Sequence, residues 1–480
     1  MITPTLEQAR TILENSHYDI IPISMEMQSD MYTPMGIMRT LKSKSRHCFV
    51  LESAENNRYT FLGFDPKTKV STKEQIEQIL GENKAPKIAG LPPFCGGLVG
   101  YFAYEYAKDF RDVDLMLFDK VIAFDNHRQK IVLIVNIKTD NLENEYSHAK
   151  IELKQLKDLI KNGTTVQIEP ARLKSDFTPL FTKEQYCSMV EKAKHYIKEG
   201  DIFQVVLSNR WQADFEGSLF DCYRVLRGIN PSPYMFYFCG TDYEIAGASP
   251  ETLVKLIGKE GGSPAPAQDG QRNGSPSGVE SVGKLYTFPL AGTRPRGKTL
   301  AEDMALEKEL LADEKELSEH NMLVDLGRND LGKISKFGSV KVDKYMNVLR
   351  FSHVMHIGSV VSGDILPDKT GLDAIEAVLP AGTLSGAPKI RAMEIIGELE
   401  DCKQSGERGI YGGAIGYLDF TGNMDTCIAI RLAYKKDGKV FVRSGAGVVA
   451  DSVPEAEYEE CLNKSMAVKK ALLQSQGGLD

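Results

Sequence analysis

The chain lacks the features that mark several large classes of protein. No apolar run approaches the roughly 18 residues of a membrane-spanning helix, and the N-terminus has no basic segment followed by an apolar core, as a secretory signal would. The eight cysteines show neither Cys-x-x-Cys nor metal-ligand spacing, which is typical of reduced core thiols in a cytoplasmic protein. A Gly-x-Gly-x-x-Gly fingerprint and a Walker loop are both missing, which argues against NAD and ATP.

The chain also lacks an excess of positive charge. The formal net charge is −8, which argues against a nucleic acid or an anionic membrane as partner. An anionic small molecule would therefore need a local group of arginine, lysine and backbone donors.

One stretch of the chain joins such a group to carboxylates. The turn Gly292-Thr293 is followed by two arginines, and glycine permits close approach of a ligand to the backbone. A capping box at Thr299 predicts a helix that runs unbroken over 299–328. Glu316 and Glu319 lie three residues apart on it and share one face.

A second acidic helix is predicted near the C-terminus. Ser452 starts it with a capping box and an early proline, and Glu457 and Glu460 again lie three residues apart, with Lys464 four residues beyond. Such spacing alone is more typical of a solvated face. Two such helices, however, could face each other across one site, and oxygen-only ligands suit Mg²⁺.

Hairpins flanked by helices predict an α+β fold with mainly antiparallel sheets. A polar segment at 162–179 suggests a boundary between an N-terminal domain, 1–175, and a catalytic domain, 180–475. Residues 258–284 are dominated by glycine, proline and serine and are expected to form a flexible loop.

In the second half of the chain, several short segments place small residues beside a single polar or charged residue. Each case alone is more typical of a structural turn, but together they suggest a seat for a rigid anion held partly through Mg²⁺. These segments are Gly382 to Lys389, Tyr411 to Gly413, Arg431 on a predicted strand, and Ser444 to Gly447.

At this point a family resemblance is clear. The motifs PLAGTRPRG, ELSEHNMLVDLGRND, GTLSGAPK, YGGAIGY, DTCIAIR and GAGVVADSVPEAEYEEC resemble those of the chorismate-utilising enzymes, and most closely the large subunits of anthranilate synthase. They cover roughly residues 180–470 in the family's order. The resemblance implies amination of chorismate at C2 by ammonia, then loss of pyruvate to give anthranilate.

The resemblance also implies roles for residues. Glu319 and Glu460 would ligate Mg²⁺, with Glu316 and Glu457 acting through water. Proton transfer would fall to Glu251 and Lys464 near the departing C4 hydroxyl and to His356 in pyruvate loss, with Thr383 in the same catalytic set. Substrate oxygens would be bound by Gly292, Thr293, Tyr411, Arg431, Gly445, Ala446 and Gly447.

Two positions distinguish the enzymes within this family. Aminodeoxychorismate synthases usually carry a nucleophilic lysine where this chain has Ala291, and isochorismate synthases carry lysine where it has Gln204. Both favour anthranilate synthase, whereas an enzyme that stops at 2-amino-2-deoxyisochorismate is excluded less firmly. A catalytically inactive amino-acid-binding regulatory protein is the alternative of a different class, and the intact acidic pairs argue against it.

The chain carries no Gly-x-Cys-x-Gly elbow, so a separate glutamine amidotransferase subunit is expected to supply ammonia. The resemblance further implies feedback inhibition by L-tryptophan at a site formed by two distant stretches. Glu52 and Ser53 would accept from the α-ammonium, and Pro233, Tyr234 and Met235 would supply backbone groups and an apolar wall for the indole.

Overall fold

The computed structural model describes residues 2–53, 58–106, 112–258, 283–350, 354–402 and 406–479. Most of the segment 258–284, predicted as a flexible loop, therefore lies outside the described residues. Within the described part, no helix is long and apolar enough to cross a membrane.

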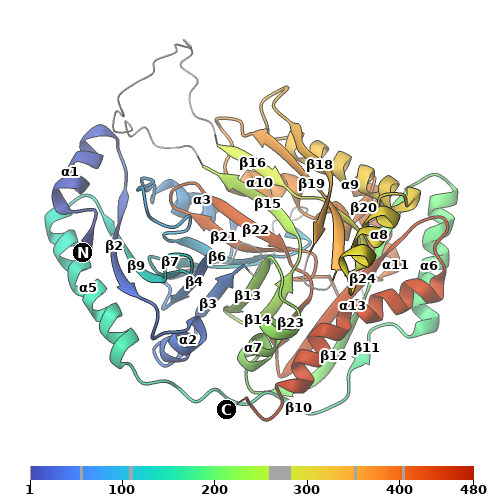
Figure 1. Cartoon of the computed structure of the whole chain (residues 1–480), viewed down its shortest axis with the longest axis horizontal. Helices are drawn as coiled ribbons and strands as arrows, with labels where there is room; N and C mark the ends of the chain where they lie inside the picture. The colour runs from blue at the N-terminus through green and yellow to red at the C-terminus, as the bar shows by residue number, and fades with distance from the viewer. Residues whose placement is uncertain are drawn as a thin grey trace.

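Two large antiparallel sheets form the body of the molecule (Figure 1). The first runs in the order β1 (Ile2–Thr3), β2 (Ile20–Gln28), β9 (Lys130–Lys138), β8 (Lys120–Asp125), β4 (Tyr59–Phe64), β3 (Cys48–Glu52), β13 (Tyr234–Cys239), β14 (Glu244–Ser249), β23 (Leu432–Lys436), β24 (Lys439–Val448), β12 (Gln204–Glu216) and β10 (Arg172–Leu173). Strands β11 (Thr178–Pro179) and β20 (Gly386–Ala387) also pair with β12.

The second sheet runs in the order β17 (Leu290–Pro295), β19 (Val354–Asp364), β16 (Lys284–Thr287), β15 (Thr252–Ile257), β22 (Met424–Ile428), β21 (Ala414–Asp419), β6 (Gly97–Phe102), β7 (Val113–Phe118) and β5 (Thr68–Val70), with β18 (Lys341–Arg350) paired to β19. The predicted fold class, α+β with mainly antiparallel sheets, is confirmed.

The two sheets pack against each other, and helices cover their outer faces. Strand β9 shows how the sequence achieves this, because its residues 131–135 are all buried. Successive side chains on a strand point to opposite faces. Val132 and Ile134 face an aromatic core between the sheets that includes Phe118, whereas Leu133 packs on the other side with Leu153 of helix α5 (Leu142–Asn162).

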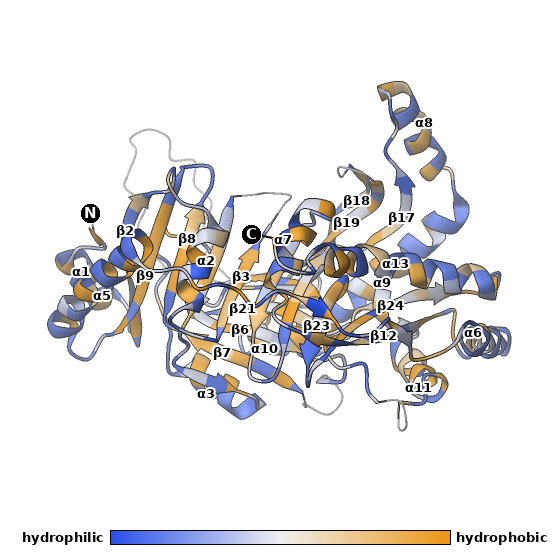
Figure 2. Cartoon of the chain, turned by 90° about the horizontal axis from the view of Figure 1, so that it is seen from below, coloured by the Kyte–Doolittle hydropathy of each residue, from blue (hydrophilic) through white to orange (hydrophobic). Residues whose placement is uncertain are grey.

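The helices are α1 (Leu6–Asn15), α2 (Pro34–Lys42), α3 (Lys73–Gly81), α5 (Leu142–Asn162), α6 (Lys183–Lys198), α7 (Phe220–Ile229), α8 (Leu300–Leu310), α9 (Glu314–Gly332), α10 (Gly371–Val378), α11 (Lys389–Leu399) and α13 (Pro454–Gln474), with a 3₁₀ turn at Gly382–Leu384. Figure 2 shows α8 standing out from the body, whereas α9 and α13 lie against it.

The prediction of one unbroken helix over 299–328 was wrong. The segment divides at 311–313 into α8 and α9. Asp313 causes the break, because its carboxylate caps α9 by accepting from the backbone N–H groups of Lys315 at 3.1 Å and Glu316 at 3.2 Å. Its other oxygen accepts from Arg294 at 2.8 Å, which fixes the start of α9 beside β17.

The prediction of a capping box at Ser452 was also wrong. The N-cap of α13 is Val453, without a side-chain cap, and Pro454 opens the helix. The Ser452 hydroxyl instead donates to Glu457 at 2.7 Å and accepts from the backbone of Val449.

Both sheets take strands from either side of the predicted boundary at 162–179. In the first sheet β3 pairs with β13, and in the second β6 pairs with β21. The division into domains 1–175 and 180–475 therefore stays a prediction, and the sheets themselves are continuous across it.

Candidate functional site

The two acidic helices, α9 and α13, approach the same end of the first sheet. Glu319 of α9 accepts a hydrogen bond from Gln204 of β12 at 3.3 Å. A Cβ added to Gly447 of β24 would lie 2.6 Å from the same amide nitrogen, so a side chain there would displace the Gln204 amide. Lys315 of α9 lies close enough to Glu457 of α13 that its charge acts to lower the pKa of that carboxyl. The two helices therefore lie near each other at this end of the sheet.

The predicted metal carboxylates repel one another. Burial and the neighbouring Glu319 raise the pKa of Glu316. Burial and the neighbouring Glu460 likewise raise the pKa of Glu457, although the hydrogen bond from Ser452 acts to lower it. A divalent cation would relieve this repulsion, and an oxygen-only donor set suits Mg²⁺.

The four carboxylates do not form a tight cluster in this structure. Among the described residues, no three His, Cys, Asp or Glu side chains are grouped closely enough to hold a metal ion. Glu460 instead forms an ion pair with Lys464 at 2.6 Å. The four residues fit Mg²⁺ by chemistry, and the site stays a prediction.

A bulge in β17 presents Gly292 and Thr293 to a histidine on the next strand. Gly292 has φ +64°, and the pairing with β19 shifts register there. His356 Nδ1 lies 2.9 Å from the Gly292 carbonyl and 3.1 Å from the Thr293 hydroxyl. Burial lowers the pKa of His356, and the nearby Arg431 adds to this effect, so the ring is neutral near pH 7.

Strand β24 and its neighbours form a site suited to an anion. A Cβ on Gly445 would lie 3.0 Å from the Tyr411 hydroxyl. Arg431 was predicted on a strand, but it lies between β22 and β23 with φ +52°. Among the described side chains, none forms a hydrogen bond or close ion pair with its guanidinium, and burial lowers its pKa against the opposing effects of Tyr411 and Glu460. A half-buried cation without a partner suits an anionic ligand.

Gly445 and Gly447 share one face of β24, because they lie opposite Ser208 and Val206 of β12. Ala446, between them, points into the core on the other side with Leu207. All three residues were predicted to bind substrate, but the two glycines and the Ala446 side chain lie on opposite faces of the strand. The backbone N–H of Ala446 lies in the ladder between the two glycines, while its side chain is away from the site.

Glu251 follows β14 and lies beside the 3₁₀ turn. The Thr383 hydroxyl donates to both of its carboxylate oxygens, at 3.1 and 3.2 Å. Burial raises the pKa of Glu251 to about 8, although Thr383 and Lys464 both act to lower it. Lys464 in turn donates to the Gly445 carbonyl at 3.3 Å, which links this carboxyl to the glycine strand. Glu251 is therefore protonated near pH 7 and can donate a proton.

A separate cavity of about 440 Å³ lies between the two sheets and contains all five residues predicted to bind an effector. Glu52 and Ser53 enter its lining from the end of β3, and Pro233, Tyr234 and Met235 from the start of β13. The stretches meet because Met235 pairs directly with Glu52 in the ladder.

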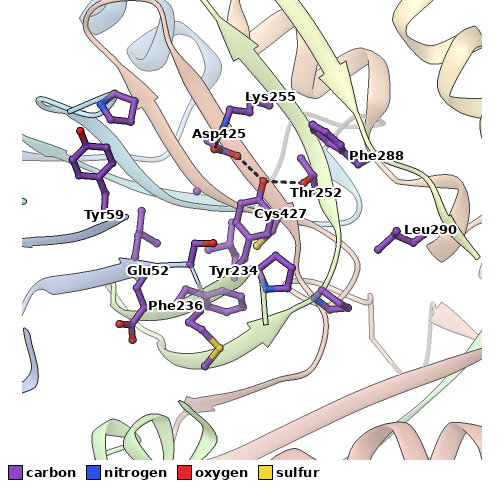
Figure 3. Close-up of a pocket in the computed structure, with 18 of the residues that line it drawn as sticks. Glu52, Tyr59, Tyr234, Phe236, Thr252, Lys255, Phe288, Leu290, Asp425 and Cys427 are labelled. Atoms are coloured by element: carbon purple, nitrogen blue, oxygen red, sulfur yellow. Dashed lines mark hydrogen bonds and ion pairs between the residues drawn. The ribbon is translucent and has the colours of Figure 1, made fainter. Parts of the chain in front are cut away.

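The side chains of two of these residues are committed elsewhere (Figure 3). The Glu52 carboxylate turns away from Tyr234. It accepts hydrogen bonds from the Tyr223 hydroxyl and from Arg227, both on α7, and one Arg227 nitrogen lies 3.0 Å from it. The Tyr234 hydroxyl donates to Asp425 at 2.7 Å and contacts Thr252 at 2.8 Å. Glu52 can therefore line the cavity with its backbone, whereas its carboxylate is already paired and does not face a ligand there.

Sequence reasoning missed the buried charges behind the site. Glu400 is fully buried between Arg408 and Arg443, whose nitrogens lie 2.5 and 2.6 Å from its oxygens. Both guanidinium groups also lie over the Tyr411 ring, at 6.0 and 5.8 Å. No signal in the sequence marks Arg443 either, because it alternates with Val440 and Val442 and falls on the face that this pattern marks as outside their core.

Comparison with known proteins places this geometry in a family. Residues 44–261 and 279–470 match the chorismate binding enzymes. Anthranilate synthase component 1 of Acetivibrio thermocellus is 43% identical over 98% of this chain and 99% of that protein. The protein of the same name from Aquifex aeolicus is 42% identical over 98% of this chain and 97% of its own length.

Solved structures agree. Anthranilate synthase component I from Streptococcus pneumoniae matches with a TM-score of 0.71 at 35% identity, covering 86% of this chain and 92% of that one. The menaquinone-specific isochorismate synthase of Escherichia coli shares the fold, with a TM-score of 0.72 at 19% identity over 98% of this chain and 99% of that one. The chain belongs to the chorismate-binding enzyme family and, within it, groups with anthranilate synthase component 1.

Proposed function

We propose that this chain converts chorismate and ammonia to anthranilate, pyruvate and water. The observation that carries the proposal is the nearly full-length likeness to anthranilate synthase component 1, 43% identical over 98% of this chain. The site supports it, because Arg431, which pairs with no side chain in the described ranges, a hydroxyl from Tyr411 and a glycine strand suit a rigid substrate with two carboxylates.

Two positions favour direct attack by ammonia. Ala291 lies on β17 next to the bulge and has no nucleophile to offer. Gln204 hydrogen-bonds to Glu319 and is no base for activating water. An enzyme that forms a covalent amine adduct or hydrates the ring would need a lysine at one or the other position, so ammonia is the proposed nucleophile at C2.

The proposed metal site consists of Glu319 and Glu460, with Glu316 and Glu457 acting through water. Mg²⁺ bound there would supply a Lewis acid for the ring carboxylate and the departing hydroxyl. Lys464 would exchange its ion pair with Glu460 for a position near Glu251, whose pKa its charge already affects.

The proposed proton transfers use groups in matching states. Glu251, with a pKa near 8, donates to the C4 hydroxyl as it leaves, and Thr383 holds the carboxyl in place. His356, kept neutral by burial, removes the C2 proton during pyruvate loss. Its Nδ1 contacts the Gly292 carbonyl, which holds a proton on that nitrogen and leaves Nε2 as the base.

We propose a glutamine amidotransferase subunit as the source of ammonia. Cys95, beside two glycines, is the cysteine most like a nucleophile in sequence, yet burial raises its pKa well above the usual range. Ammonium should therefore support anthranilate formation by the purified chain, whereas glutamine should not. Turnover with glutamine alone would contradict this part of the proposal.

The main test is fluorescence. Purified chain with chorismate, ammonium and Mg²⁺ should develop anthranilate emission, and removal of Mg²⁺ with a chelator should abolish it reversibly. A regulatory protein without activity would give no emission under any of these conditions, and that result would overturn the proposal.

We further propose that L-tryptophan binds the cavity of about 440 Å³ and inhibits the enzyme. This volume lies in the range of small-molecule pockets. Leu290 and Gly358 line the cavity and face each other across β17 and β19. Gly292 and His356 of the proposed catalytic site lie on the same two strands, each two residues away from this pair. A shift of this strand pair would reach both sites, which supports inhibition from a distance.

Ser53→Phe tests the effector site. The added ring should fill the cavity and leave an active enzyme that tryptophan no longer inhibits, whereas Ser147→Phe, on the exposed face of α5, should remain sensitive. Inhibition that is purely competitive with chorismate and unchanged in Ser53→Phe would refute this site while leaving the synthase activity untouched.

A further inference from the structure

Two cysteines face each other on neighbouring strands of the first sheet, at the ends of β3 and β13 opposite to those that line the cavity. Cys48 opens β3 and Cys239 ends β13, and the two are direct partners in the antiparallel ladder. Direct partners have Cα atoms about 4.5–5.5 Å apart, and disulfides span about 4.4–6.8 Å. The two thiols lie on the same face of the sheet, beneath α2 and α7, in one core cluster.

A lysine donates to one of these thiols, and a tyrosine hydroxyl lies beside both groups. Lys42, at the end of α2, donates to the Cys239 sulfur at 3.6 Å and to the Tyr237 hydroxyl at 2.8 Å. That hydroxyl lies 3.1 Å from the same sulfur and donates its own proton to Glu244 at 2.6 Å. The pKa of Cys239 is lowered, first by its hydrogen bond with Cys48 and also by Lys42 and Tyr237, although burial and the nearby Glu244 oppose this. The pKa of Cys48 is raised by the same hydrogen bond and by burial.

Lys42 remains charged although it is largely buried. Burial acts to lower its pKa, but Cys239, Cys48 and the nearby Glu244 raise it above the usual value. A cation held beside a thiol stabilises the thiolate, which is the reactive form of cysteine. The arrangement therefore gives the two sulfurs different roles, with Cys239 as the nucleophile and Cys48 as the partner that remains protonated.

We propose that Cys48 and Cys239 form a reversible disulfide when the protein meets hydrogen peroxide. The Cys239 thiolate attacks one peroxide oxygen, the O–O bond breaks, and hydroxide leaves as a sulfenic acid forms on Cys239. The Cys48 sulfur then attacks the Cys239 sulfur, an S–S bond forms, and the sulfenic oxygen leaves as water with the Cys48 proton. Peroxide is reduced by two electrons, which the two thiols supply.

The bond would join the two strands whose opposite ends line the large cavity. Glu52 ends β3 and Met235 lies near the start of β13, and both contribute to that cavity. Oxidation would therefore fix the register of these strands at one end while the ligand cavity occupies the other. This inference does not depend on the identity of the cavity ligand or on the activity.

The test uses the full chain with Cys187 and Cys402 replaced by serine, because these two are the cysteines that are not fully buried. Native protein is treated with hydrogen peroxide, unreacted thiols are alkylated, and peptides are mapped by mass spectrometry without reduction. We expect loss of two thiols, a cross-linked pair of peptides containing Cys48 and Cys239, and full reversal by dithiothreitol.

Single variants assign the roles. Cys48→Ser should leave a sulfenic acid on Cys239 that dimedone traps, and Cys239→Ser should prevent the reaction at both positions. Lys42→Met should slow the oxidation several-fold while leaving the same product. Cys222 is an equally buried cysteine of the same core cluster and is the internal control.

Three results would overturn the inference. The cross-linked peptide could be absent while circular dichroism shows an intact fold. Cys222 could oxidise as fast as Cys239, which would mean that reaction needs unfolding. Finally, Lys42→Met could react at the wild-type rate, which would remove the role of the cation.

Discussion

Replacing Glu400 by glutamine should destabilise the protein more than any other single loss of charge discussed above. The carboxylate follows α11 and is fully buried between Arg408 and Arg443. It also accepts from the backbone N–H of Ser208 at 2.7 Å and from the Ser208 hydroxyl at 2.9 Å. Burial alone would raise the pKa of Glu400, but the two guanidinium groups hold it below the usual range.

The expected magnitude follows from these contacts. Glutamine keeps the shape but replaces one accepting oxygen by a donating NH₂ group, which faces arginine donors. Removing one partner of a buried ion pair costs about 3–5 kcal/mol, or a hundredfold or more in the folding equilibrium. With a urea slope of about 3 kcal/mol per M, the midpoint of unfolding should fall by about 1–1.7 M.

The assay is urea unfolding followed by circular dichroism at pH 7, with Glu394→Gln as control. Glu394 lies on the same helix and forms an exposed ion pair with Arg391, so its loss should cost well under about 1 kcal/mol. A shift no larger in Glu400→Gln than in the control would refute the reasoning.

The effect should also depend on pH. The folded pKa of Glu400 is below its ordinary value of 4.5, so its contribution is fully present above pH 4.5 and declines as pH falls further. The difference in stability between wild type and Glu400→Gln should therefore shrink below about pH 4, and an undiminished difference there would contradict the assignment.

Activity should fall as pH rises through about 8, because Glu251, with a pKa raised by burial to about 8, then loses the proton it is proposed to donate; residual activity of Glu251→Gln with the same alkaline limb would contradict this. Glu319→Gln and Glu460→Gln should each lower anthranilate formation at least about a hundredfold without changing the unfolding midpoint, and normal turnover by either would remove the metal assignment. The fluorescence of Trp211, the single tryptophan, should titrate near pH 8, because Lys469 lies 3.8 Å from its ring centre and burial lowers the lysine pKa to about 8; an unchanged titration in Lys469→Met would exclude that lysine as the cause.

The sequence allowed the fold class to be predicted because hairpins and amphipathic helices leave local signals. The capping box at Thr299 is such a signal, and it opens α8 in the structure. Element ends were less predictable where a side chain competes with the backbone. Asp313 ends one helix and starts another, and no periodicity reveals which of several aspartates on an acidic helix will do so.

Contacts between distant segments could be predicted only through the family resemblance. The meeting of Glu52 with Met235 is set by strand register, which local patterns do not specify for strands 180 residues apart. The orientation of the Glu52 carboxylate toward Arg227 was not predictable from either source, since it depends on where α7 packs. Likewise, the charges of Arg408 and Glu400 give no sign of burial in the sequence, because isolated charges are normally exposed.

The most direct test of the proposed reaction is its stoichiometry. Purified chain is supplied with chorismate, ammonium and Mg²⁺, anthranilate is measured by fluorescence, and pyruvate is measured with lactate dehydrogenase and NADH in the same sample. The account predicts one pyruvate for each anthranilate throughout the reaction, with no other aminated product. Accumulation of 2-amino-2-deoxyisochorismate or of 4-amino-4-deoxychorismate, either of them without pyruvate, would contradict it.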